Sequence, residues 1–368
     1  MALALPDFPW DLLTPYAEQA REHPGGIVDL SVGSPVDPTP TSVREALAAA
    51  TDAHAYPATS GTPALREAIV DWYARRRGVD DLTVDNVIPT IGSKELVALL
   101  PTLLGLGRGD VVVQPTAAYP SYAVGAAVVG ATVISSDEPD DWPAETKLVW
   151  LNSPGNPDGR VHSLAFLRRA VVRARELGAV IANDECYAEL DWDSDEATPS
   201  ILHPEVTRGS RRLTLSVYSL SKQSNLAGYR AAFLAGCSEL VGELLQARKH
   251  LGLMPPAPVQ AAMIAALGDE AHVAAQKELY RRRREVLIEA LTASGFRIDD
   301  SSAGLYLWAS RDEDCWQTVA ALARLGILVA PGAFYGAAGA RHVRVALTAT
   351  DARVNEAAAR LRAGRVER

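Results

Sequence analysis

The chain has 368 residues, of which 48% are hydrophobic and 22% are charged, so we expect one or two folded domains and exclude a wholly disordered chain. The net charge of −9 argues against a nucleic acid as the main partner, because a polyanion is bound by clustered positive charge. The three cysteines form no CxxC pair and the histidines show no metal-ligand spacing, so neither a disulfide framework nor a metal site is expected.

The amino-terminal segment MALALPDFPWDLL has no basic region and no long apolar stretch, and it is not typical of a secretory signal. The sequence also contains no run of about 18 apolar residues that could cross a bilayer. We therefore expect a cytoplasmic protein without a membrane partner.

Helical and strand patterns alternate through the first two thirds of the chain. Helices are predicted at residues 42–51, 62–78, 93–107, 122–130 and 164–178. Strands are predicted at residues 110–115, 131–135, 147–152, 179–185 and 212–218. Short strands that alternate with helices indicate an α/β fold with a mostly parallel sheet, sandwiched by helices on both faces. Ligands bind at the carboxyl ends of such strands.

The pattern changes after about Gly242, where a helix-rich stretch precedes short strands at 295–299, 304–310, 327–332 and 342–347. This indicates a smaller α+β domain. We expect residues 1–40 to form an amino-terminal arm and part of the small domain, residues 41–242 to form a large cofactor-binding domain, and residues 243–368 to form the small carboxy-terminal domain.

A lysine lies in the loop after the predicted strand at 212–218, in the sequence Ser219-Leu220-Ser221-Lys222, and Arg230 follows eight residues later. A lysine amine attacks an aldehyde, while hydroxyl and guanidinium groups donate to a phosphate dianion. An N-capping serine beside a solvated lysine is the alternative, but it does not explain the arginine. The pattern predicts pyridoxal 5′-phosphate (PLP) joined covalently to Lys222, with Ser219 and Arg230 at its phosphate.

Asp184 ends the apolar strand at 179–185, and Tyr187 follows three residues later. PLP withdraws electrons only if its pyridine nitrogen stays protonated, which a carboxylate partner secures. Asp184 is the candidate, although a lone aspartate in this place is more often a helix N-cap. Tyr187, and Asn156 in the turn NSPGNPDG, are candidates to donate to the 3′ oxygen of the cofactor.

Two further segments precede predicted helices or follow predicted strands. Ser93 and Lys94 open the helix at 93–107, whose free N–H groups could bind an anion, although a plain capped helix is the alternative. Tyr119 follows the strand at 110–115 and could stack on the pyridine ring.

Arg344 interrupts an apolar strand, as expected of an arginine that binds an α-carboxylate with two hydrogen bonds. Tyr56 lies in a loop from which it could reach the phosphate of a neighbouring subunit.

The motifs GSKE, YPSY, NSPGNPDG, DECY and SLSK, taken with Arg230, resemble the fold-type I (class I/II) PLP-dependent aminotransferases over nearly the whole chain. The resemblance implies a homodimer with shared active sites and small amino-acid and keto-acid substrates. It also implies a proton-shuttle role for Lys222 and a substrate-side backbone contact at Gly33. The chain has Asp158 where that family usually has threonine in NPTG, which leaves Asn156 in place.

Within that family the chain most resembles the actinobacterial type of N-succinyldiaminopimelate aminotransferase of lysine and diaminopimelate biosynthesis. The resemblance rests on the segments SVGSPVDPTP, SLSKQSNLAGYR, RKHLGLMPPAPVQAAM and ALTATD. It implies amino transfer between glutamate and N-succinyl-2-amino-6-ketopimelate. For the distal succinyl carboxylate we expect the basic segment Arg248-Lys249-His250, with Lys249 as the cation, while a solvated helix end is an equally good interpretation.

Three rival functions remain open at this point. The first is another reaction of the same cofactor, either transamination of another amino acid or a C–S β-lyase reaction. The second is a non-enzymatic PLP-binding regulator, which lacks support because no basic helix-turn-helix pattern precedes residue 30. The third is a dinucleotide-binding dehydrogenase, for which the expected GxGxxG motif after the first strand is missing.

Overall fold

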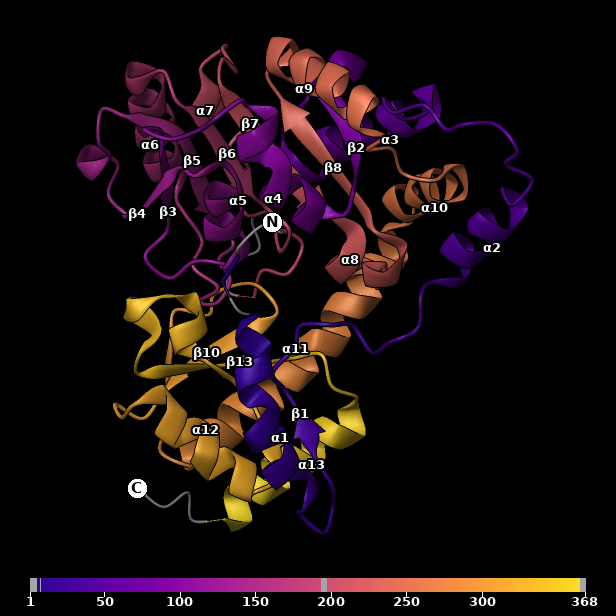
Figure 1. Cartoon of the computed structure of the whole chain (residues 1–368). Helices are drawn as coiled ribbons and strands as arrows, with labels where there is room; N and C mark the ends of the chain where they lie inside the picture. Colours follow the sequence, from indigo (N-terminus) through magenta and orange to yellow (C-terminus); the bar gives the residue numbers. More distant parts are fainter. Residues whose placement is uncertain (1–4, 7, 193–196, 365–368) are drawn as a thin grey trace.

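The computed structural model describes residues 5–6, 8–192 and 197–364 (Figure 1). The parts of the three expected domains at 1–4, 7, 193–196 and 365–368 therefore lie outside the described residues. Its largest element is a seven-stranded sheet. In spatial order the strands are β2 (Val87–Ile91), β8 (Ala231–Gly236), β7 (Thr214–Ser219), β6 (Val180–Asp184), β5 (Thr146–Asn152), β3 (Val111–Gln114) and β4 (Thr132–Ser135). β8 runs antiparallel to both of its neighbours and the other pairs are parallel, which confirms the expected mostly parallel sheet.

Helices cover both faces of this sheet. One face packs on α3 (Pro63–Arg77), α6 (Leu164–Leu177) and α10 (Ala257–Gly268), and α2 (Thr41–Ala49) packs on α10. The other face packs on α4 (Ser93–Leu103), α5 (Ser121–Val129) and α9 (Ser238–Leu251). Successive side chains of each strand point to opposite faces of the sheet, so each buried strand contributes apolar side chains to the cores on both faces. This is why the strands are continuous apolar runs in the sequence. The short helices of this part are α7 (Pro204–Thr207), α8 (Leu220–Gln223), η2 (Val84–Asn86), η3 (Pro139–Asp141) and η4 (Ala227–Tyr229).

The second body contains a four-stranded sheet with the order β12 (Ala330–Pro331), β13 (His342–Ala346), β10 (Tyr306–Ser310) and β9 (Arg297–Asp299). A parallel pair, β1 (Val28–Asp29) and β11 (Ile327–Leu328), lies beside it. Its helices are η1 (Pro9–Leu13), α1 (Thr14–Arg21), α11 (Glu270–Ala293), α12 (Cys315–Arg324), η5 (Gly332–Tyr335), η6 (Ala337–Gly339) and α13 (Asp351–Ala363).

The amino-terminal segment packs with this second body, as Figure 1 shows for α1 and β1 beside α12 and α13. Leu13, Val28 and Leu30 are part of the same apolar core as Leu322 and Leu361. The packing supports the proposed amino-terminal contribution to the small domain.

The boundary proposed at residue 242 is less sharp, because α9 and α10 still pack on the large sheet and α11 leads to the second body. The segment at 327–332, expected as one strand, is divided between β11 and β12, which pair with different strands. In the described residues, no helix is long and apolar enough to cross a membrane.

Candidate active site

The site forms where β5, β6 and β7 end. These strands are parallel neighbours, with Asn152 paired with Asp184 and Asp184 paired with Val217. Their carboxyl ends therefore lie at one edge of the sheet, and the loops that follow bring together Asp184, Asn156 and Lys222. The structure thus places close together three residues that lie far apart in the sequence.

Asp184 is a buried carboxylate at the end of β6, with 7% of its surface exposed. It accepts hydrogen bonds from Tyr122 Oη at 3.1 Å and from the backbone N–H of Cys186 at 3.1 Å. Burial raises the pKa of Asp184 above its usual range. No lysine or arginine pairs with it in the described residues, so this carboxylate can serve a protonated ring nitrogen.

Lys222 lies in α8, directly after β7, and its Nζ donates to the carbonyl oxygen of Gly33. Burial lowers the pKa of Lys222, which favours the neutral amine that attacks an aldehyde and accepts a proton. Gly33 belongs to the amino-terminal segment, so the lysine meets a backbone group that the sequence analysis expected on the substrate side.

A set of hydrogen-bond donors lies beside the carboxyl end of β7, where β2 ends and β8 begins. Ser93 and Lys94 begin α4, Ser219 caps α8, and Arg230 directly precedes β8. The strands place these residues together, because Ile91 pairs with Ala231 and Ser219 pairs with Ala232.

Gly92, with φ of 75°, allows close approach within this set, since a Cβ there would collide with the guanidinium of Arg230. Hydroxyl groups, an exposed guanidinium and free N–H groups at the start of α4 together fit a phosphate dianion. The side chain of Lys94 is exposed, with Nζ 5.5 Å from the ring centre of Phe8.

Tyr119 is half-buried on the loop after β3, and burial raises its pKa. Its ring meets Tyr122 edge-on, with 5.8 Å between the ring centres. Tyr122 in turn stacks on Trp150 and donates to Asp184. The position of Tyr119 beside these groups fits a ring that lies over a flat aromatic ligand.

Arg344 and Asn156 join the two bodies at the site. Arg344 Nη1 donates to Asn156 Oδ1 at 2.9 Å, and Nη2 donates to the carbonyl oxygen of Ser31 at 2.7 Å. The arginine is buried, and its Nε has no hydrogen-bond partner among the described residues. A buried guanidinium without a carboxylate partner fits the α-carboxylate of a substrate.

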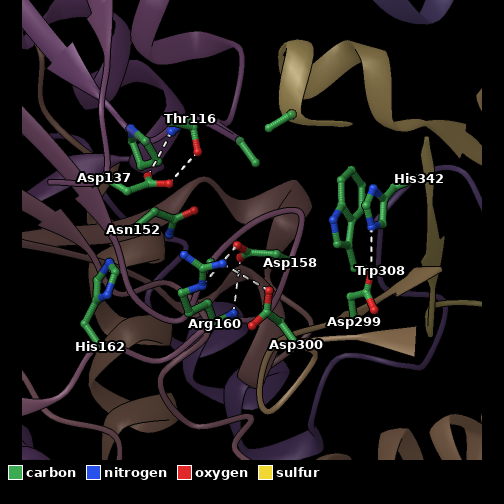
Figure 2. A pocket seen from close by; sticks show the side chains of 14 residues that line it. Thr116, Asp137, Asn152, Asp158, Arg160, His162, Asp299, Asp300, Trp308 and His342 are labelled. Carbon is green, nitrogen blue, oxygen red and sulfur yellow. Dashed lines mark hydrogen bonds and ion pairs between the residues drawn. The ribbon is translucent and has the colours of Figure 1, made fainter. Parts of the chain in front are cut away.

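A cavity of about 310 Å³ lies between the two bodies, beside the loop of Asn156 (Figure 2). Its polar residues already have partners: Arg160 pairs with Asp300 at 3.2 Å, His342 pairs with Asp299 at 2.8 Å, and Asp137 accepts from Thr116. Its lining contains neither Lys222, Asp184 nor Arg344, so it neighbours the reaction site without being part of it.

Two expected site residues are not brought to the site within one chain. Tyr56 is 98% exposed, and Lys249 is exposed near the end of α9. Their position is compatible with a contribution to a neighbouring subunit. Arg248, from the same basic segment, is not available to a substrate, because it is buried and bound to Glu95.

The sequence analysis assigned no role to Tyr306, Tyr335, Trp10 or Tyr122, which surround the expected residues. The sequence did offer an indication for Tyr122, since it lies in the motif YPSY three residues after Tyr119. It contained no indication of a role for Tyr306, Tyr335 or Trp10, because aromatic residues in short apolar segments are usually core residues. Only the tertiary structure brings them to Arg344, whose Cζ lies 3.8, 5.1 and 5.8 Å from their respective ring centres.

A lysine whose pKa is lowered by burial, a buried carboxylate, a set of donors that fits a phosphate and a large doubly covered sheet together define a PLP-dependent enzyme of fold type I. The chain belongs to the family "Aminotransferase class I and II", whose model matches residues 26–361. It is therefore an aminotransferase that uses pyridoxal phosphate.

Relatives of the chain are aminotransferases over nearly their full length. It is 55% identical over 97% of its length to 4-dedimethylamino-4-oxo-anhydrotetracycline transaminase OxyQ of Streptomyces rimosus, of which 99% is covered. It is 54% identical over 98% of its length to the probable aminotransferase Rv1178 of Mycobacterium tuberculosis, of which 86% is covered. LL-diaminopimelate aminotransferase of Desulforudis audaxviator is 35% identical, with 91% and 90% of the two chains covered.

Solved structures of the same fold are also similar. The probable N-succinyldiaminopimelate aminotransferase of Thermus thermophilus aligns with a TM-score of 0.87 at 28% identity, over 97% of this chain and all of the other. The fold and the family agree with the sequence analysis, whereas the relatives carry different substrate names.

Proposed function

We propose that the chain transfers an amino group between glutamate and N-succinyl-2-amino-6-ketopimelate, in the glutamate-consuming direction of lysine and diaminopimelate biosynthesis. The observation that carries this proposal is the buried guanidinium of Arg344, whose Nε is unpartnered beside Asn156. It suits the α-carboxylate that both substrates share. The relative named LL-diaminopimelate aminotransferase supports a diaminopimelate skeleton, and the resemblance of the motifs supports its succinylated form.

The residues have separate roles in this proposal. Pyridoxal phosphate supplies the electron-withdrawing ring that takes up the electron pair released when the substrate loses its α-proton. Lys222 holds the cofactor and, once released from it, takes the α-proton from the substrate and returns it to the cofactor. Asp184 keeps the ring nitrogen protonated, while Asn156 and Tyr187 donate to the 3′ oxygen. Tyr119 covers the ring and Gly33 lines the substrate side.

The phosphate is bound in this proposal by Ser93, the backbone of Lys94, Ser219 and Arg230. Tyr56 of a second copy completes that site, which implies a cytoplasmic homodimer with shared active sites. The exposure of Tyr56 in the single chain supports this arrangement, because an exposed tyrosine of this kind is available to a partner. The distal succinyl carboxylate is assigned to Lys249, which is exposed and whose ammonium group makes no ion pair or hydrogen bond within the described residues.

A second candidate substrate is a polycyclic ketone, which the name of the OxyQ relative favours at 55% identity. A pocket for such a ring system needs no distal cation, so the two candidates differ in their demand for Lys249. A C–S β-lyase reaction on the same cofactor would instead release a thiol and a keto acid from one substrate.

A substrate panel tests the proposal. Purified holoenzyme is given 2-oxoglutarate with N-succinyl-LL-2,6-diaminopimelate, unmodified LL-diaminopimelate or aspartate, and glutamate formation is followed. We expect kcat/KM to be roughly ten- to a hundredfold higher for the succinylated substrate, because a desolvated charge pair is worth roughly 1.5–3 kcal/mol. A preference for the unmodified substrate, or activity only with a polycyclic ketone and glutamate, would refute the proposed substrate but not the aminotransferase activity.

A further inference from the structure

Tyr306 contacts several groups of the active site at once. It is the first residue of β10 and is 4% exposed. Its hydroxyl oxygen lies 3.2 Å from Tyr187 Oη, and Arg344 Cζ lies 3.8 Å from the centre of its ring. The same hydroxyl lies against Gly33, since a Cβ there would collide with it, and the Gly33 carbonyl accepts from Lys222. A purely apolar role would not need this hydroxyl.

The charges around Tyr306 make it the better donor of the two tyrosines. Burial alone would raise its pKa, yet the positive charge of Arg344 lowers the pKa below its usual value. Burial raises the pKa of Tyr187 well above its usual range. Either hydroxyl can donate across this 3.2 Å contact, and the lower pKa of Tyr306 favours Tyr306 as the donor to the oxygen of Tyr187.

We propose that Tyr306 is a positioning residue of the transamination, whose hydroxyl donates to Tyr187 and whose ring supports the guanidinium of Arg344. A tyrosine hydroxyl has one hydrogen to donate. When the Tyr187 oxygen accepts from Tyr306, the hydrogen of Tyr187 is directed to its other partner, and chained hydrogen bonds polarise and strengthen one another. Tyr187 thereby becomes a stronger donor to the 3′ oxygen of the cofactor.

The test uses the holoenzyme and the pH titration of the visible absorbance of its lysine-bound cofactor. A weaker donor at Tyr187 leaves more negative charge on the cofactor oxygen, which holds the titrating proton more tightly. Tyr306→Phe should therefore raise the midpoint by roughly half a unit to one unit, the size of one hydrogen bond. It keeps the ring and the volume, so the affinity for the cofactor should change by less than about twofold.

A double-mutant cycle separates an effect through Tyr187 from a general one. In the Tyr187→Phe background, the Tyr306→Phe change should produce no further shift of the midpoint. Tyr335→Phe is the matched control, because the Tyr335 ring also lies beside Arg344 but its buried hydroxyl has no partner among the described residues. A lowered or unchanged midpoint in Tyr306→Phe overturns the proposal, as does the same shift in both backgrounds or in Tyr335→Phe.

KM measurements test separately whether the ring of Tyr306 supports Arg344. Tyr306→Phe retains a flat ring beneath Arg344 and should leave KM for both the amino donor and the keto acid within about twofold. Tyr306→Leu removes the cation–π contact and should raise both KM values by roughly three- to thirtyfold. Equal KM values in the two variants would show that the ring does not support Arg344.

Discussion

The guanidinium of Arg248 at the end of α9 binds the carboxylate of Glu95 in the first turn of α4 with two hydrogen bonds, of 2.9 and 3.1 Å. Glu95 also accepts from the backbone N–H of Ile91, on the other side of Gly92. One buried ion pair therefore fixes the turn from which α4 presents its free N–H groups. This turn is one wall of the proposed phosphate site.

Removal of this pair should destabilise the chain. Arg248→Ala leaves Glu95 as a largely buried charge without its partner, and the free energy of unfolding should fall by about 3–5 kcal/mol. Arg75→Ala is the matched control, because its pair with Glu270 is about half exposed and should contribute less than about 1 kcal/mol. Urea denaturation at saturating PLP measures both variants, and equal losses would contradict the assignment.

Lys222→Ala should fold but lose the covalent link to the cofactor and the group that moves the proton. We expect turnover to fall by at least about 10²–10⁴, the contribution of a positioned general base. Borohydride reduction of the native enzyme and peptide mapping should place the pyridoxyl group on Lys222. A label on another lysine would show that the cofactor lysine is misassigned.

Asp184→Asn should retain the shape of the site but lose the charge that faces the ring nitrogen. Turnover should fall by roughly 10²–10³, while the affinity for PLP changes far less, because the charge acts mainly where the electron pair is taken up. Single-turnover kinetics with glutamate and a titration with PLP measure the two quantities. Near-native turnover would mean that another group keeps the nitrogen protonated.

Lys249→Ala tests the distal carboxylate site. If Lys249 pairs with the succinyl group, KM for the succinylated substrate should rise by roughly ten- to a hundredfold, while KM for glutamate changes less. Arg344→Ala is the control, since it should impair both half-reactions alike. The same loss for both substrates in Lys249→Ala, or no loss in either, would leave the lysine as a solvated helix end.

His162 gives a prediction on pH. Burial lowers the pKa of His162 to about 4 from an ordinary value of 6.5, and its ring stacks on Phe166 with 4.1 Å between centres. Between these two pH values the unfolded chain binds a proton that the folded chain does not, so stability rises with pH there. His162 should account for about 3 kcal/mol of the stability that the wild type loses as the pH falls from 6.5 to 4. His162→Phe should lack this share of the loss in urea denaturation at several pH values.

The sequence by itself determined the large sheet, its family and the residues that lie directly after strands. Lys222, Asp184 and Asn156 were predictable because the carboxyl ends of parallel strands meet at one edge, and turn and strand patterns locate those ends. The positions of the donors proposed to bind the phosphate were predictable for the same local reason, since they begin helices or follow strands.

Only the tertiary structure decided the part of the site that comes from the second body. Tyr306 and Arg344 lie on antiparallel strands, and Tyr187 follows β6 of the large sheet, so their contacts depend on how the second body packs against the loop after β6. A period-two strand pattern predicts which residues share a face but not which ligand or neighbour that face meets. The ion pair of Arg248 with Glu95 could not be predicted from the sequence either, because the two residues lie 153 positions apart in the chain.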